Sequence, residues 1–160
     1  MAEDLVPFTK AGYDRLQAEL AQLKNIERHA VIQDIATARS HGDLKENAEY
    51  SAAREKQGFI EGRINELEGQ LSRANVLDFS SDPAAQGQVR FGAKVTVEDL
   101  NSGDKKTLHV VGDLEADIKE NRISLSSPIA KALLGKKIDD IVEVQAPKGL
   151  IEYQILQITY

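Results

Sequence analysis

The segment from Arg39 to Tyr50 carries three carboxylates at intervals of three residues, Asp43, Glu46 and Glu49. On a helix this spacing keeps side chains roughly on one face, so the three acids would form one small cluster. In proteins, Mg²⁺ keeps several waters and is held by one or two carboxylates together with phosphate oxygens. Exposed carboxylates alone would bind Mg²⁺ weakly, so these acids are candidates for completing a metal site whose other ligands come from elsewhere.

The same acids also have a purely structural interpretation. Asp43 and Glu46 have the spacing of a capping box, in which Asp43 accepts a hydrogen bond from the backbone N–H of Glu46 and Glu46 reaches back to Asp43. Acids in a first turn also suit the positive end of the helix dipole. From the residues alone, both interpretations stay open. His41 is interpreted as an exposed bend residue rather than as a metal ligand.

The stretch before the acidic segment is predicted to form one long helix. Thr9 is a good N-cap after Phe8, and no Pro or Gly interrupts residues 13–40. The apolar spacing first alternates between four and three residues, as in a coiled-coil seam, and then runs in steps of four, which predicts a local relaxation of the supercoil. The seam positions are Tyr13, Leu16, Leu20, Leu23, Glu27, Val31, Ile35 and Ala38.

The stretch after the acidic segment predicts a second, more regular helix. Its seam alternates between steps of three and four without a break, at Tyr50, Ala53, Gln57, Ile60, Ile64, Leu67, Leu71 and Ala74. Gly42 favours a short bend, so the two helices are expected to be antiparallel neighbours. About 30 residues per arm at 1.5 Å each give a rod of roughly 45 Å. Gly58, Gly62 and Gly69 lie off the seam, where we expect them to be tolerated.

The second half of the chain has a different hydrophobic period. Residues 78–87 are polar and contain Pro83 and Gly87, so they predict a boundary between a hairpin at 1–79, with its tip at 39–50, and a globular domain at 80–160. Beyond it, alternating apolar residues predict short strands, with a bend at Gly92. Ser127 and Pro128 predict a helix start. The pattern indicates an α+β fold, with a small antiparallel sheet and one short helix.

Composition narrows the class of protein. The chain has 160 residues, a net charge of −6 and no Cys, which excludes disulfides and thiolate metal sites. Acids exceed bases by 14 to 10 in residues 1–79 and by 12 to 10 in residues 80–160, so neither half would bind nucleic acid by charge alone. No apolar run approaches the ~20 residues needed to span a bilayer, and the acidic start lacks a signal-peptide pattern. We therefore expect a cytoplasmic protein.

Residues 41–50 and 52–55 resemble the signature of the GreA/GreB transcript cleavage factors, a bacterial family that binds RNA polymerase, and they are most similar to GreA. Residues 127–130 form a second matching segment, and the likeness runs from about Phe8 to the last residue. The resemblance implies a coiled-coil hairpin followed by an FKBP-like domain. It also implies that the protein is a transcription elongation factor, grouped with DNA-binding proteins of transcription. The free protein is expected to be a monomer.

The resemblance further implies a mechanism. The hairpin would enter the secondary channel of RNA polymerase, and Asp43 and Glu46 would complete the second Mg²⁺ site of the polymerase. They would position water to hydrolyse backtracked RNA near its 3′ end. The Mg²⁺ would be shared with the polymerase and not bound tightly by the free protein. The chain would therefore stimulate cleavage by the polymerase without being an enzyme itself.

Other residues of the two matching segments receive roles from the same resemblance. Arg54 matches a basic position that faces the extruded RNA, and Arg39 on the other arm could assist it; both could instead be ordinary solvated residues. Ser127, Pro128 and Ile129 match the region by which the globular domain holds the polymerase. These three residues also make a well-formed helix start without any partner. Glu49, Asn47 and Tyr50 are expected to have supporting roles.

Two other functions are open. A regulator or inhibitor could occupy the secondary channel without stimulating cleavage, although the intact pair of Asp43 and Glu46 argues against it. A prolyl isomerase is suggested by the FKBP-like fold, but the sequence offers no obvious aromatic-lined pocket. No glycine-rich phosphate loop, zinc motif or nucleophile elbow appears, so the sequence predicts no self-contained active site.

Overall fold

The computed structural model describes residues 4–43 and 47–160, which divide into two compact units. The first unit contains the residues up to Leu5 and Tyr13–Ala74, and the second contains Val6–Gly12 and Asn75–Tyr160. The β-rich unit therefore takes a short piece from the beginning of the chain, which the sequence did not reveal. The predicted boundary between residues 79 and 80 stays a prediction.

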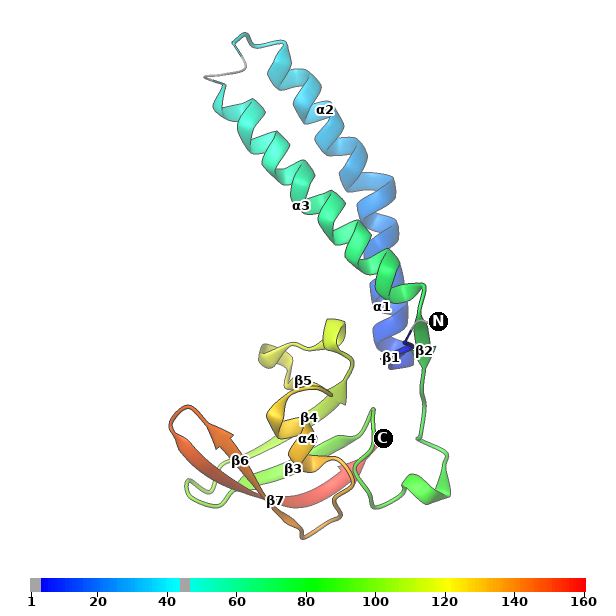
Figure 1. Ribbon diagram of the computed structural model, residues 1–160, viewed down its shortest axis with the longest axis vertical. Helices are drawn as coiled ribbons and strands as arrows, with labels where there is room; N and C mark the ends of the chain where they lie inside the picture. The colour runs from blue at the N-terminus through cyan, green and yellow to red at the C-terminus, as the bar shows by residue number, and fades with distance from the viewer. Residues whose placement is uncertain (1–3, 44–46) are drawn as a thin grey trace. The chain divides into compact units, whose positions relative to one another are not determined.

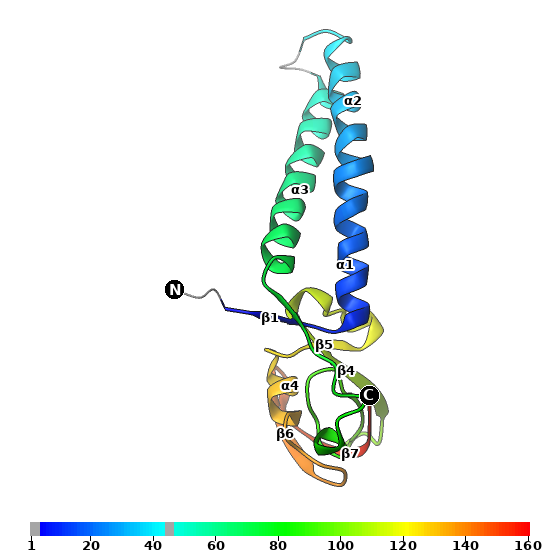
Figure 2. The same cartoon turned by 90° about the vertical axis from the view of Figure 1, so that its right-hand side faces the viewer.

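The first unit is a helical hairpin (Figure 1). One arm consists of α1 (Lys10–Gln22), η1 (Leu23–Glu27) and α2 (Arg28–Arg39), and the other arm is α3 (Ala48–Leu71). Figure 2 shows α2 and α3 side by side along the hairpin. The prediction of two neighbouring antiparallel helices is confirmed. Within the described ranges, no helix is long and apolar enough to cross a membrane.

The sequence predicted one long helix for the first arm, but this arm is not a uniform α-helix. η1 is a π-helical segment, and it begins at Leu23, where the apolar spacing changes to steps of four. A π-helix has i→i+5 hydrogen bonds and more residues per turn than an α-helix. The wider turn keeps Leu23 and Val31 buried on the same side of the arm. The irregular apolar spacing therefore marks a real irregularity of the arm. The sequence predicted a relaxed supercoil there, and the structure has a π-helical segment.

Buried seam residues and ion pairs between the arms fix the register of the hairpin. Most predicted seam positions of α3 are buried, namely Ala53, Ile60, Ile64, Leu67 and Leu71. Arg28 forms a two-pronged ion pair with Glu61, with N–O distances of 2.8 and 2.9 Å, and its hydrogen bond lowers the pKa of Glu61. Arg63 binds Glu19 in the same way at 2.7 and 3.0 Å. Bidentate pairs restrict geometry as well as adding energy, so sliding of one arm is opposed.

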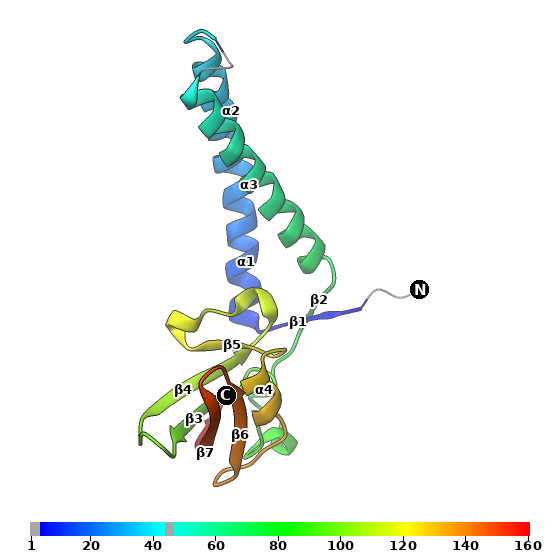
Figure 3. The ribbon, with the colours of Figure 1, turned by 60° about the vertical axis from the view of Figure 1, so that its left-hand side comes forward.

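The second unit contains a five-stranded sheet in the order β5-β4-β3-β7-β6 (Figure 3). Its strands are β3 (Lys94–Asp99), β4 (Lys105–Val111), β5 (Arg122–Ser124), β6 (Ile141–Ala146) and β7 (Gly149–Thr159). All neighbouring pairs are antiparallel except β4 and β5. The chain between these two strands passes through η3 (Asp113–Glu115) and η4 (Ile118–Glu120), which form the crossover that a parallel pair needs. The expectation of a wholly antiparallel sheet is therefore wrong for β5.

One face of the sheet and the short helix α4 (Pro128–Leu133) form the core of the second unit. Val95 and Val97 on β3 are fully buried, as their alternation predicted, and Ala130 and Leu133 of α4 belong to the same cluster. The segment before β3 contains η2 (Pro83–Ala85) and a turn at Gly92, whose φ of 86° confirms the predicted bend. These contacts make the unit a small α+β domain.

A buried carboxylate secures the beginning of the chain to the second unit. β1 (Val6–Phe8) pairs with β2 (Ala74–Val76), and the next residue, Thr9, contacts Glu115 of η3. Glu115 is only 3% exposed and accepts hydrogen bonds from the backbone N–H of Thr9 at 3.0 Å, the Thr9 hydroxyl and the N–H of Gly112 at 3.2 Å. Thr9 also caps α1, because its Oγ1 accepts from Gly12 N at 3.0 Å.

Two helical glycines should respond oppositely to the same change. A Cβ at Gly62 of α3 would meet no atom of the described chain within 4 Å, whereas a Cβ at Gly12 of α1 would lie 1.7 Å from Glu115 Oε1. We expect Gly62→Ala to raise the free energy of unfolding by about 1 kcal/mol, since Gly is a poor helix former. Gly12→Ala should lower it, because the buried carboxylate must move. Urea unfolding measures both variants, and equal shifts would contradict the prediction.

Candidate functional site

The acidic segment joins the two arms at the tip of the hairpin. α2 ends at Arg39, and Ser40 continues with a helical φ of −68°. Gly42 then has a φ of 124°, in the region that favours glycine, and Asp43 follows as an exposed residue. The prediction of a bend at Gly42 is confirmed. Glu46 lies outside the described residues, so its proposed role stays a prediction.

The second helix begins later than the capping-box interpretation required. Its N-cap is Asn47, which has an extended backbone and whose side chain accepts from Tyr50 N at 3.0 Å. Asp43 therefore does not cap α3, and the expectation that Asp43 shares one helical face with Glu49 is wrong. Asn and Asp are equally good N-caps, so the sequence alone could not show that Asn47 rather than Asp43 begins the helix. Among the three acids only Glu49 lies in the first turn of α3.

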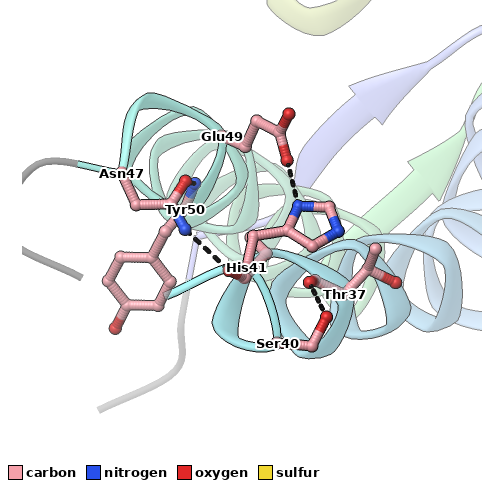
Figure 4. Close-up of polar contacts among 7 residues, drawn as sticks. Thr37, Ser40, His41, Asn47, Glu49 and Tyr50 are labelled. Carbon is pink, nitrogen blue, oxygen red and sulfur yellow. Dashed lines mark hydrogen bonds and ion pairs between the residues drawn. The ribbon is translucent and has the colours of Figure 1, made fainter. Parts of the chain in front are cut away.

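Asn47 also connects the two arms. Its side-chain Nδ2 donates to the carbonyl oxygen of Ala38 in α2 at 2.6 Å. The same carbonyl oxygen also accepts from the backbone N–H of His41 at 3.1 Å, so Asn47 adds a second donor, from the other arm, at the end of α2. Figure 4 shows Asn47 beside Tyr50 at the start of α3 and facing the end of α2. The family resemblance implied only a supporting role for Asn47, and no local pattern indicated a contact between Asn47 and Ala38.

A second contact across the tip is an exposed polar contact between His41 and Glu49. His41 Nδ1 lies 2.9 Å from Glu49 Oε2, and their side chains are 54% and 69% exposed (Figure 4). The two residues line a surface hollow of about 410 Å³ together with Asp43, Asn47 and Ala48. The predicted exposure of His41 is confirmed.

The two arginines predicted to face RNA line one groove between the arms. Arg39 and Arg54 border a hollow of about 400 Å³ together with Ile32, Ile35, Ala36 and Gln57. The Arg39 guanidinium lies 6.0 Å from the centre of the Tyr50 ring, within range for a cation–π contact. Arg54 Nη1 donates to Gln57 Oε1 at 3.1 Å. The structure thus places two arginines from different arms at one groove, whose other lining residues are mostly apolar.

The donor atoms at the tip suit a hard cation in part. Asp43 provides an exposed carboxylate at the hollow, and Mg²⁺ prefers oxygen ligands of this kind. Within residues 4–43 and 47–160, no three His, Cys, Asp or Glu side chains are grouped so that they could hold a metal ion. A cation at this place would therefore need ligands beyond those of the described residues.

Comparison with known proteins shows the family. The family described as "Transcription elongation factor, N-terminal" matches residues 6–76, and "Transcription elongation factor, GreA/GreB, C-term" matches residues 84–160. The chain belongs to the GreA/GreB family of transcription elongation factors. Transcription elongation factor GreA of Alkalilimnicola ehrlichii is 54% identical over 158 residues, covering 97% of this chain and 98% of that protein. The same factor of Legionella pneumophila strain Lens is 53% identical over 154 residues, covering 96% of each.

Solved structures of the GreA/GreB family also align with the chain. The Gfh1 protein of Thermus thermophilus, a GreA factor homolog, is 31% identical, with 98% of this chain and 99% of that chain covered and a TM-score of 0.44. A GreA/GreB factor from Nitrosomonas europaea is 21% identical, with 99% and 100% covered and a TM-score of 0.44.

Residues 127–130, the second segment that resembles the GreA/GreB family, lie in the second unit. Ser127 is the N-cap of α4, and its side chain accepts from Ala130 N at 3.3 Å. Pro128 is exposed in the first turn, and Ile129 is partly buried against the core. The predicted helix start is confirmed, while the predicted contact of these residues with polymerase stays a prediction.

The second unit also has a hollow that the sequence did not suggest. It measures about 290 Å³ and is lined by Phe79, Phe91 and Tyr160 together with polar residues that include Lys10 and His109. Burial lowers the pKa of His109, and the neighbouring Lys94 adds to this effect. The sequence offered no obvious aromatic-lined pocket, because Phe79 and Tyr160, which both line this hollow, lie far apart in the chain.

Proposed function

We propose that this protein binds RNA polymerase and stimulates hydrolysis of backtracked nascent RNA near its 3′ end by the polymerase itself. The observation that carries the proposal is the placement of an exposed Asp43 at the tip of a hairpin whose arms are held in register, in a chain of the GreA/GreB family. The chain acts here as a factor and not as an enzyme. Mg²⁺ is shared with the polymerase and bound poorly by the free factor.

In this proposal the hairpin passes through the secondary channel of the polymerase as an antiparallel coiled coil. The alternation of buried residues along α3 supports that packing. Asp43 and Glu46 then supply carboxylate oxygens to the second Mg²⁺ site of the polymerase and orient the attacking water. The ions supply activation of that water and stabilisation of the leaving oxygen. Two carboxylates are enough for this task because phosphate and polymerase groups provide the other ligands.

Other residues have binding roles in the same proposal. The groove of Arg39 and Arg54 faces the extruded RNA, where guanidinium groups can pair with phosphates and stack on bases. Ser127, Pro128 and Ile129 of the second unit, which we propose to be FKBP-like, contact the polymerase surface. We propose a cytoplasmic monomer that meets RNA only within the transcription complex.

A cleavage assay on a backtracked elongation complex tests the proposed function. Complexes with end-labelled RNA are incubated with Mg²⁺, with and without the protein. We expect shortened RNA to appear much faster when the protein is present, and no cleavage when the protein meets the same RNA without polymerase. Equal rates with and without the protein would refute the proposal. They would favour the alternative, a regulator that occupies the channel without stimulating cleavage, provided that the protein still binds polymerase.

A further inference from the structure

The side chain of Asn47 uses both of its polar ends. Its Oδ1 caps α3 through Tyr50 N, and its Nδ2 reaches Ala38 O at the end of α2. Capping requires only the acceptor, so Asp or Ser would serve equally well for that purpose. Asp has no donor, and Ser is too short to span the same gap while it caps. The bond between the arms therefore depends on the amide group.

We propose that Asn47 is a positioning residue for the tip carboxylate Asp43, an inference that rests on the function proposed above. Asp43 lies in the segment between Ser40, at the end of α2, and Asn47, the N-cap of α3. Joining the two ends of such a segment removes many of its conformations. Less entropy is then left to lose when the Asp43 carboxylate adopts the one geometry that a metal site requires.

The other contact across the tip is less suited to this task. His41 and Glu49 are both more than half exposed, so water competes for their contact, and even a fully charged exposed pair contributes little. Asn47 is only partly exposed, and its 2.6 Å bond to Ala38 O is shielded better from competing water. Contacts that support metal ligands typically change metal affinity or activity by about 10- to 100-fold when they are removed.

Substitutions at Asn47 can separate positioning from capping. Asn47→Asp and Asn47→Ser keep the cap and lose the bond to Ala38, whereas Asn47→Ala loses both. In the cleavage assay we expect Asn47→Asp and Asn47→Ser to raise the Mg²⁺ concentration for half-maximal cleavage about tenfold, with unchanged affinity for polymerase. The agreement of a charged and a neutral variant excludes an effect of added charge. The same changes at Asn65, an exposed residue of α3, provide the control and should change nothing.

Amide hydrogen exchange supplies a readout of capping. The Tyr50 amide should stay protected in Asn47→Asp and Asn47→Ser and exchange faster in Asn47→Ala. If only Asn47→Ala needs more Mg²⁺, then Asn47 is merely a helix cap and the inference is wrong. The inference also fails if all three variants respond to Mg²⁺ like the unmodified protein. A lack of stimulation by the unmodified protein would instead refute the proposed function, and the inference with it.

Discussion

Asp43→Asn is expected to reduce stimulated RNA cleavage by about 100-fold or more while polymerase binding is unchanged. The substitution keeps the size of the side chain and removes its negative charge. A metal ligand that contributes about 3 kcal/mol to the transition state corresponds to a factor of roughly 100 in rate. The measurement is the single-turnover rate of RNA shortening at saturating factor, with binding followed by competition against the unmodified protein. Glu46→Gln should behave similarly.

The structure makes this experiment cleaner than the sequence suggested. If Asp43 had capped the second helix, part of any defect would have come from loss of helix stability. The cap is Asn47, so that explanation does not apply to changes at Asp43. Asp34→Asn is a matched control, because Asp34 is an exposed acid on α2. Cleavage by Asp43→Asn at the rate of the Asp34→Asn variant would show that Asp43 is not a metal ligand.

Glu115→Ala is expected to lower the free energy of unfolding of the second unit by about 3 kcal/mol. The substitution leaves the N–H groups of Thr9 and Gly112 without their acceptor in a buried place, and each such group costs roughly 1 to 3 kcal/mol. Glu115→Gln should be milder, since it keeps one carbonyl oxygen. Because the protein has two units, the measurement should be specific to one of them: exchange of the most protected amides of β3 and β7 under native conditions.

A control for Glu115 is available in the next short helix, η4. Glu120 is an exposed residue of η4, and Glu120→Ala should change stability by no more than about 0.5 kcal/mol. If Glu115→Ala and Glu120→Ala slow or accelerate exchange equally, the buried carboxylate is not a main support of this unit.

The sequence predicted the elements that rest on periodicity and local signals. The seam of α3, the bend at Gly42 and the start of α4 at Ser127 all appear where expected. Each depends on neighbours within about four residues, for which side-chain spacing is a direct physical signal.

The features that could not be predicted depend on contacts between residues far apart in the chain, or on a choice between two residues that are equally good N-caps. The choice of Asn47 over Asp43 as cap was decided by a bond to Ala38, nine residues away in the other arm. The contact of Glu115 with Thr9 spans 106 residues. The parallel pairing of β5 likewise follows from a crossover whose path no short pattern encodes. At the candidate site, the sequence predicted the bend and the exposed Asp43, but not the hydrogen bond between Asn47 and Ala38.

The contact between Thr9 and Glu115 has a consequence for protein synthesis. The ribosome makes Thr9 106 residues before Glu115, which at about 10 residues per second is a delay of roughly 10 s. The helical hairpin is complete in sequence during that interval and can form from local contacts, which are fast. Thr9 cannot donate to the Glu115 carboxylate until most of the chain has been made. A nascent chain released before Glu115 was made would therefore contain the whole hairpin, while Thr9 lacked its buried acceptor.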